Sequence, residues 1–164
     1  METRTANSKL PGVGSGGVLV ILRITVGALF GSTFFENLHK GLYTPAGYAS
    51  LIHYYIQYGH APAIWKAVMG SAAASSVVSA PLQGILESSL GILLIIGLFS
   101  RPAAFVAFVF LTSLWVSEWG LGWYWELLMP MIVALSLALG PSGEYMAVDL
   151  ALARRWPRLA RLVT

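Results

Sequence analysis

One apolar stretch, from Gln83 to Ala104, limits what this chain can fold into more than any other. It runs apolar from Gly84 to Phe99 and contains one acidic residue, Glu87. Such a run is long enough to cross a lipid bilayer as a helix. Gly97 and the following Arg101-Pro102 step predict a helix end, a tight turn and a new helix, because proline suits a first helical turn. A carboxyl group inside an apolar span is costly, so Glu87 requires a structural or functional explanation.

The composition indicates that this stretch belongs to an integral membrane protein. Hydrophobic residues make up 57% of the 164 residues and charged residues only 10%, whereas a soluble domain carries about 25% charged residues. The chain contains no cysteine, which excludes disulfides, thiolate metal sites and thiol relays of its own. The basic residues lie at expected helix ends and in the terminal segments, a pattern that gives no support to nucleic-acid binding.

Four membrane-spanning helices are expected, at residues 17–35, 80–99, 102–119 and 124–139. Their lengths are close to the roughly 20 residues that a bilayer requires, and Pro130 predicts a kink in the last one. A cleaved signal peptide is the alternative for the first span, but its apolar region is too long and no A-x-A-like site follows. The predicted fold is therefore all-α and integral to the membrane, with an antiparallel four-transmembrane-helix bundle over residues 17–150.

Three segments lie outside these spans: an N-terminal arm (1–16), an outer loop (41–79) and a basic tail (151–164). Residues 47–59 of the loop are rich in tyrosine and predict a short helix at the membrane interface, where tyrosine is favoured. Residues 62–78 are mildly apolar. A fifth span is the alternative there, but a surface segment leading into the second span is preferred.

The distribution of basic residues favours four spans over five. With four, the N-terminal arm, the turn at Arg101 and the arginine-rich tail share one side, while Lys40 and Lys66 lie on the other. The positive-inside rule then predicts that both termini are cytoplasmic. The Trp and Tyr residues between positions 115 and 125 are expected to form an aromatic belt at the outer face.

Arg23 is a charged residue inside the first span, about 9 Å along it by helix rise. One interpretation is a salt-bridged or snorkelling arginine that fixes the depth of the helix, with Asp149 as its partner. The other is a contact to an anionic substrate or a quinone head group. The structural interpretation is preferred.

Acidic residues gather in the expected outer half of the helices: Glu36, Glu87, Glu118 and Glu126. Lys40 follows Glu36 by one helical turn and is the expected partner of Glu36 or Glu87. Two interpretations stay open. The acids form either a polar network that holds the helices together or an outward-facing site that handles protons or binds a ligand.

The three histidines, His39, His53 and His60, are candidate metal or haem ligands. Their spacing matches neither H-x-x-x-H nor H-E-x-x-H, and C-x-x-C-H is excluded by the lack of cysteine. Hydrogen bonding at the interface is therefore preferred, and no metal site is predicted. The sequence also contains no catalytic triad, Walker loop or dinucleotide fingerprint that we can recognise.

Four stretches, taken together, resemble the DoxX/DoxD family of small membrane proteins. They are Leu22-Arg23 with Gly27 and Phe30–Lys40, Glu87 with Gly91, Gly97–Ala104, and Gly140–Tyr145 with Asp149. Their order and spacing, from Leu19 to Asp149, carry the resemblance. The family's glycine before its lysine is replaced by Asn37-Leu38-His39, and its Tyr-Ser-Leu-Asp close reads Met146-Ala147-Val148-Asp149.

The resemblance implies a four-helix bundle in a prokaryotic cell membrane that works beside other subunits in quinone-linked redox chemistry. The long aromatic loop is more similar to the DoxD branch, which is found in thiosulfate:quinone oxidoreductase. The positions carried over from the family are Arg23, Lys40, Glu87, Arg101 and Asp149. In this interpretation Lys40 attracts the anion, and Glu87 and Glu126 exchange protons with the quinone.

The predicted roles divide into two groups. Lys40, Glu87 and Glu126 are the candidate catalytic residues. The predicted structural framework consists of Arg23, Glu36, Arg101 and Asp149. No cofactor-binding motif is recognised, and a quinone is the candidate substrate.

The first functional hypothesis is a DoxX-like membrane subunit of a quinone-linked redox complex, with thiosulfate:quinone oxidoreductase as the specific candidate. The alternative is a non-catalytic structural subunit that packs against a larger respiratory or photosynthetic complex. A small transporter or channel is a third hypothesis, although four short spans with few internal charges offer little pathway. Lipid and other subunits of a membrane complex are the expected partners.

Overall fold

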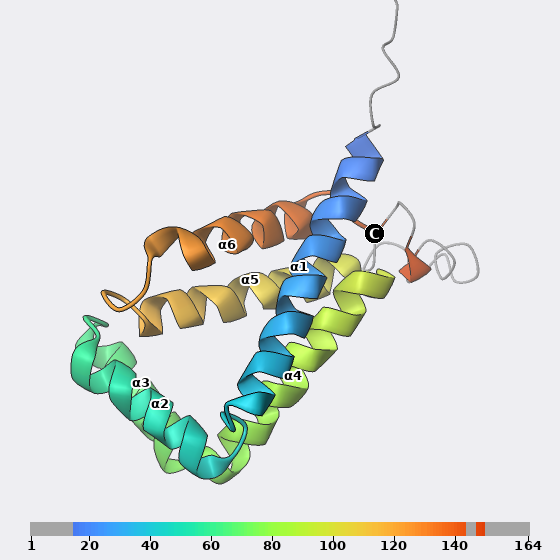
Figure 1. Cartoon of the computed structure of the whole chain (residues 1–164). Helices are drawn as coiled ribbons and strands as arrows, with labels where there is room; N and C mark the ends of the chain where they lie inside the picture. The colour runs from blue at the N-terminus through green and yellow to red at the C-terminus, as the bar shows by residue number, and fades with distance from the viewer. Residues whose placement is uncertain (1–14, 144–146, 150–164) are drawn as a thin grey trace, which may run out of the picture.

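The computed structural model describes residues 15–143 and 147–149. In this part of the chain all regular structure is helical, which confirms the predicted all-α class (Figure 1). The elements are α1 (Ser15–His39), α2 (Pro45–Tyr58), α3 (Ala63–Ala74), α4 (Ser76–Ile96), α5 (Ser100–Ser117) and α6 (Tyr124–Leu139). The basic tail and nearly all of the N-terminal arm lie outside the described residues.

Three of the described helices are long and apolar enough to cross a membrane. They cover Gly16–His39, Ser76–Ile96 and Ser100–Ser117. The fourth expected span, α6, is an apolar helix of 16 residues that contains Pro130. Its length is about 24 Å by helix rise, less than the roughly 30 Å of a bilayer core.

The four apolar helices pack as two pairs (Figure 1). α1 lies along α4, and α5 lies along α6. The two pairs meet where α4 turns into α5 and diverge from that point, and α2 and α3 connect their far ends (Figure 1). The antiparallel four-helix bundle that the sequence predicts is therefore not confirmed.

The apolar core lies where the two pairs meet, and all four helices contribute to it. Its buried side chains include Val26, Phe30, Leu90, Leu94, Ala104, Leu111, Met131 and Leu137. Large apolar side chains on the outward faces are exposed, for example Ile21, Ile85 and Ile92. Exposed apolar surface on this scale is expected where lipid covers a helix.

Two glycines let α1 and α4 approach closely. A Cβ atom added to Gly27 would lie 2.8 Å from Ile95 Cγ1 and 3.0 Å from the carbonyl oxygen of Gly91. A Cβ atom added to Gly91 would lie 3.3 Å from the carbonyl oxygen of Gly27. Small residues at these positions therefore bring the two backbones together, as is common between membrane helices.

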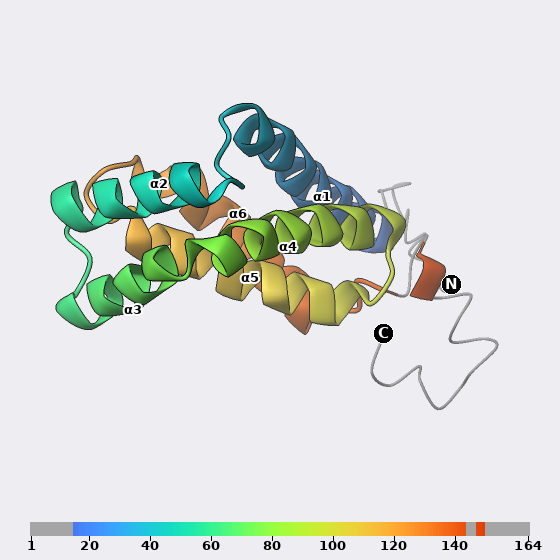
Figure 2. The same cartoon turned by 90° about the horizontal axis from the view of Figure 1, so that it is seen from below.

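The outer loop is almost entirely helical. α2 starts after Thr44, whose side chain accepts a hydrogen bond from the Gly47 N–H, with Pro45 in the first turn. α3 has 12 residues, too few for the fifth span that the sequence left open. It leads into α4 with only Ser75 between them (Figure 2). Both helices share a second core with α4, formed by Tyr48, Ile52, Ala61, Met69, Ala73 and Ala80.

Polar groups close the end at which the two pairs meet. Arg23 is 1% exposed; its Nη1 donates to the carbonyl oxygen of Ser142 at 3.0 Å, and the charge of Asp149 acts on it. The Asp149 carboxylate accepts hydrogen bonds from the backbone N–H groups of Phe99 and Ser100, both at 2.7 Å. A negative charge at the N-terminus of α5 is stabilising, because the helix dipole is positive there.

The turn between α4 and α5 depends on Gly97. This residue ends α4 with a left-handed backbone (φ 70°), and a Cβ atom there would lie 2.6 Å from Arg23 Nη1. α5 then begins at Ser100, two residues before Pro102. Arg101 Nε donates to the carbonyl oxygen of Ala138 at 3.2 Å, which links the start of α5 to the end of α6. The predicted helix end at Gly97 is confirmed.

Candidate functional site

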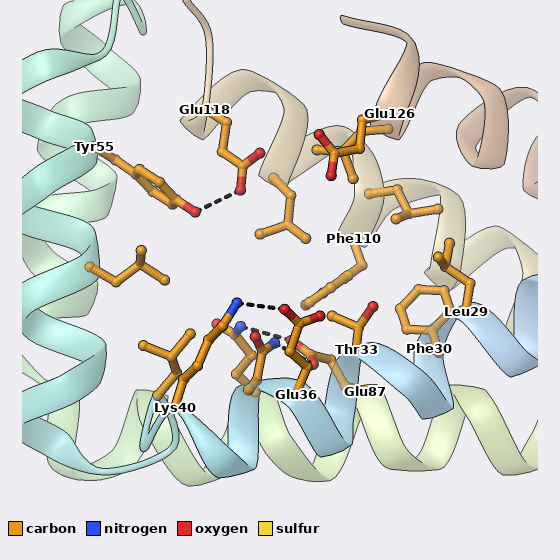
Figure 3. Close-up of a pocket in the computed structure, with 17 residues that line it drawn as sticks. Leu29, Phe30, Thr33, Glu36, Lys40, Tyr55, Glu87, Phe110, Glu118 and Glu126 are labelled. Atoms are coloured by element: carbon orange, nitrogen blue, oxygen red, sulfur yellow. Dashed lines mark hydrogen bonds and ion pairs between the residues drawn. The ribbon is translucent and has the colours of Figure 1, made fainter. Parts of the chain in front are cut away.

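A cavity of about 430 Å³ lies between the two diverging helix pairs and α2 (Figure 3). Eight of its lining side chains are apolar: Leu29, Phe30, Leu42, Leu51, Phe110, Leu111, Leu114 and Leu127. The polar lining residues are Thr33, Glu36, Asn37, Lys40, Tyr55, Gln83, Glu87, Glu118 and Glu126. A cavity of this size that combines apolar side chains with convergent polar groups is typical of a small-molecule site.

The structure brings the four outer acids of the sequence together around this cavity. Lys40 joins them, while Arg23, Arg101 and Asp149 lie at the opposite, closed end of the helix pairs. The candidate catalytic residues Lys40, Glu87 and Glu126 therefore share one site. Their catalytic roles stay predictions.

Glu87 is the most buried of the acids in the cavity, with 1% of its surface exposed. Its Oε2 accepts hydrogen bonds from the Tyr43 hydroxyl at 2.5 Å and from Asn37 Nδ2 at 3.1 Å. Its Oε1 accepts one from Gln83 Nε2 at 2.8 Å. All three donors are uncharged, so hydrogen bonds from neutral groups hold this carboxyl group in place.

The chain builds this arrangement from nearby helical positions and one turn. Gln83 precedes Glu87 by one helical turn, so the two side chains face each other on α4. Tyr43 lies in the turn after α1, where its ring stacks on Phe34 with a centroid distance of 5.4 Å. Gly84 leaves room for that ring, since a Cβ atom there would lie 3.1 Å from Tyr43 Cγ. Burial, with a further contribution from Glu87, raises the pKa of Tyr43, so its hydroxyl stays a donor.

A second carboxyl–tyrosine pair lies on the opposite wall of the cavity (Figure 3). The Tyr55 hydroxyl, on α2, donates to Glu118 Oε1 at 2.6 Å, and Glu118 directly follows α5. Burial raises the pKa of the Glu118 carboxyl, and the negative charge of nearby Glu126 raises it further, against the opposing effect of the Tyr55 hydrogen bond. Burial and the contact with Glu118 also raise the pKa of Tyr55.

Two further contacts fix α2 and α3 on the end of α5. Trp65 Nε1 donates to Ser117 Oγ at 2.9 Å, and the His60 backbone N–H donates to the carbonyl oxygen of Trp119 at 2.6 Å. Gly120 has a left-handed backbone (φ 87°) and lies against the His60 ring, where a side chain would collide with it. The position of Tyr55 in the cavity is therefore held by contacts outside the cavity.

Lys40 pairs with Glu36, one of the two partners that the sequence left open. Its Nζ lies 2.6 Å from Glu36 Oε1, and both side chains are more than half exposed, at 58% and 63%. This pair therefore lies at the solvent-facing rim. It provides no counter-charge at the buried carboxyl of Glu87, which Asn37, Tyr43 and Gln83 surround instead.

The histidines do not converge. His39 Nδ1 lies 2.6 Å from the carbonyl oxygen of Phe35, His53 is exposed on α2, and His60 packs against Gly120. Within residues 15–143 and 147–149, no three His, Asp or Glu side chains are grouped as metal ligands.

Sequence reasoning did not assign Asn37, Tyr43, Gln83 or Tyr55 to the site. The spacing of Gln83 and Glu87, four residues apart on a helix, was a usable signal. Tyr43 and Tyr55 were not identifiable in this way, because their partners lie 44 and 63 residues away along the chain.

These features define a helical protein with membrane-length apolar helices and a cavity lined by carboxyl groups. The chain belongs to the DoxD family, because the family model described as "TQO small subunit DoxD" matches residues 18–163. TQO denotes thiosulfate:quinone oxidoreductase. The resemblance to the DoxX/DoxD family is thereby confirmed, and family and helices together indicate a membrane protein. No curated protein and no solved structure matches the chain.

Proposed function

We propose that this chain is the quinone-reacting membrane subunit of a thiosulfate:quinone oxidoreductase, and that its cavity receives the quinone head group. One observation supports this most: a cavity with apolar side chains along its walls contains a buried carboxyl group, Glu87, held by three uncharged hydrogen-bond donors. A quinone head group is a flat apolar ring with hydrogen-bond-accepting oxygens, so both properties of the cavity suit it.

The reaction needs protons at the place where the quinone is bound. Reduction of a quinone to a quinol consumes two electrons and two protons. A carboxyl group that borders the ligand cavity is a suitable proton donor, because a positioned acid can transfer its proton directly to a bound ligand. We assign one proton to Glu87, and we place the electron-transfer groups in a partner subunit, since this chain offers neither a thiol nor a recognised cofactor motif.

The charge of the cavity favours a neutral ligand over an anion. Four glutamates and one lysine line it, and the lysine is already paired with Glu36 at 2.6 Å. A dianion such as thiosulfate would meet the negative charge of Glu126, while the only lysine among the lining residues is neutralised by Glu36. We therefore place thiosulfate oxidation outside this cavity. We assign Lys40 a structural role, its ion pair with Glu36 at the end of α1, instead of the anion-attracting role that the family resemblance implied.

The proposed topology has four spans, with α6 as a short fourth one and both termini on the cytoplasmic side of a prokaryotic cell membrane. Arg101 lies at the closed end, where the two helix pairs meet. That end faces the cytoplasm in this topology, as the positive-inside rule expects. The cavity then lies in the outer half of the membrane, and its carboxyl groups exchange protons with that side.

The experiment that tests this function is purification from the native membrane in a mild detergent, with mass spectrometry of co-purifying proteins and an assay of thiosulfate-dependent quinone reduction. We expect a redox partner in a fixed ratio and a turnover that falls by about 10²-fold or more in Glu87→Gln, the effect of losing a positioned acid. Unchanged turnover per assembled complex, with reduced complex yield, would support the structural-subunit alternative.

A further inference from the structure

We propose that Tyr55 and Glu118 form a second proton-transfer pair, and that Glu118 and Glu87 each protonate one oxygen of the bound quinone. This inference rests on the proposed function and deepens it. It adds a second catalytic group, which the family match does not assign.

The geometry consists of two carboxyl–tyrosine pairs on facing walls. Glu87 belongs to the wall made by α1 and α4, while Glu118 and Tyr55 belong to the wall made by α5 and α2 (Figure 3). In each pair a tyrosine hydroxyl donates to the glutamate, from Tyr43 at 2.5 Å and from Tyr55 at 2.6 Å. Apolar side chains such as Phe30 and Phe110 line the cavity as well, and they suit the faces of a ring.

A ligand that contacts both walls at once needs a polar atom at each end. In a 1,4-quinone the two carbonyl oxygens point in opposite directions across the ring, so one can approach Glu87 and the other Glu118. In a 1,2-quinone the oxygens are adjacent and point to the same side. Such a ligand forms hydrogen bonds with the carboxyl group of one wall only. The carboxyl group of the other wall then faces apolar atoms of the ligand, which is unfavourable.

The proton balance needs two donors. Two thiosulfate ions give up one electron each as they join through a new S–S bond, and the quinone takes up both electrons. Each quinone oxygen then takes one proton, one from the Glu87 carboxyl group and one from the Glu118 carboxyl group. The two carboxylates that remain are reprotonated from water, Glu118 by way of the adjacent exposed carboxyl group of Glu126.

The surroundings of Glu118 suit a proton donor. The ionisable groups that face it are Tyr55 from α2 and Glu126 from α6, and neither of them is cationic. Burial and the charge of Glu126 both favour its protonated form. Tyr55 belongs to α2, so the site is complete only when α2 and α3 pack against the end of α5. The hydrogen bonds of Trp65 and His60 hold them there.

The test compares Glu118→Gln and Tyr55→Phe with wild type in the purified complex, using a decyl-substituted 1,4-benzoquinone as substrate. We expect kcat to fall by about 10²-fold or more in Glu118→Gln, because the carboxamide cannot supply the proton. Tyr55→Phe removes only the hydroxyl and should lower kcat to a smaller degree. The control is Tyr58→Phe on the same helix, a side chain 56% exposed, for which we expect wild-type kinetics.

A binding measurement separates this inference from the proposed function. We would titrate each variant with the same quinone and with a decyl-substituted phenol, which has a single oxygen. Glu87→Gln and Glu118→Gln should both weaken quinone binding, whereas only one of them should weaken binding of the phenol.

Each outcome of these measurements decides between the two claims. Wild-type kinetics and binding in both Glu118→Gln and Tyr55→Phe, with an impaired Glu87→Gln, would overturn the inference and leave the proposed function standing. A wild-type complex that neither binds nor reduces quinone would overturn the proposed function itself. If Glu118→Gln fails to assemble, Tyr55→Phe decides the inference.

Discussion

The two ends of the helix pairs both bury charged residues, but they stabilise them in different ways. At the closed end, the negative charge of Asp149 attracts the guanidinium group of Arg23. The Asp149 carboxylate also accepts two backbone hydrogen bonds at the start of α5. At the open end, neutral tyrosine hydroxyls donate to Glu87 and Glu118, and a cavity remains between them. In the proposed function, the identity of the partner, more than burial itself, distinguishes the structural carboxylate of Asp149 from the proton-transferring carboxyl groups of the cavity.

This difference has a direct chemical consequence. The Asp149 carboxylate is held in a fixed place by two backbone N–H groups at the positive end of α5. The carboxyl groups of Glu87 and Glu118 instead line a cavity, where a ligand can approach them. We therefore expect the closed end to matter for folding and the open end to matter for turnover.

The largest expected effect on stability is at Asp149. Asp149→Ala removes two short backbone hydrogen bonds and the carboxylate that acts on Arg23, and breaking such a buried charged arrangement costs about 3–5 kcal/mol. Glu87→Gln keeps the shape of its side chain, so we expect a loss of about 1 kcal/mol, the value of one hydrogen bond. Reversible unfolding in mixed micelles measures both. Equal losses in the two variants would remove the distinction between the ends.

Gly97 gives the next largest effect. Gly97→Ala places a Cβ atom 2.6 Å from Arg23 Nη1 and puts alanine in a left-handed conformation, which alone costs about 1–2 kcal/mol. Gly70→Ala on α3 is the matched control, because nothing lies within 4 Å of the added Cβ atom and alanine favours the helix by about 1 kcal/mol. Thermal unfolding midpoints should fall in the first variant and stay level or rise in the second. The reverse order would show that Gly97 does not restrict the turn.

The pH dependence of stability sharpens the comparison at the open end. Burial raises the pKa of Glu118 above its ordinary value of 4.5, so the folded protein binds this proton more tightly than the unfolded chain does. The resulting stabilisation is complete below pH 4.5 and is lost as the pH rises through the raised value. Glu118→Gln should flatten this part of the profile of unfolding midpoint against pH. Parallel profiles for wild type and variant would contradict the assignment.

The smallest effect is expected at Lys40. Its pair with Glu36 is exposed, and such pairs contribute about 0–1 kcal/mol. Lys40→Ala should therefore change the free energy of unfolding little, and the dependence of turnover on thiosulfate concentration should match that of wild type. A strong rise in the thiosulfate concentration needed for half-maximal turnover would restore the anion-attracting role for this lysine.

The sequence predicted local features well. Gly97 was identifiable as a helix end because glycine tolerates the left-handed backbone that the structure has there. The outer acids were expected to gather because four alternating spans bring Glu36, Glu87, Glu118 and Glu126 to one side, and all four line one cavity. Periodicity and span counting are sufficient for such predictions.

The sequence did not predict the features that depend on contacts between distant segments. The two helix pairs diverge, and α2 and α3 pack between their far ends. The sequence predicted that the outer loop, which contains α2 and α3, is only partly helical. The donors Tyr43 and Tyr55 reach glutamates on other helices. Such pairings depend on tertiary packing, which spacing along one helix does not reveal.

The most direct test of the central claim is to photolabel the purified complex with an azido-substituted 1,4-benzoquinone and to map the labelled peptides by mass spectrometry. The account predicts labels on the cavity-lining segments 29–40, 83–87 and 110–118, which lie in α1, α4 and α5 or directly after them. Excess unmodified quinone should compete and abolish the label. Labels confined to the exposed faces of the helices, or to a partner subunit alone, would contradict it.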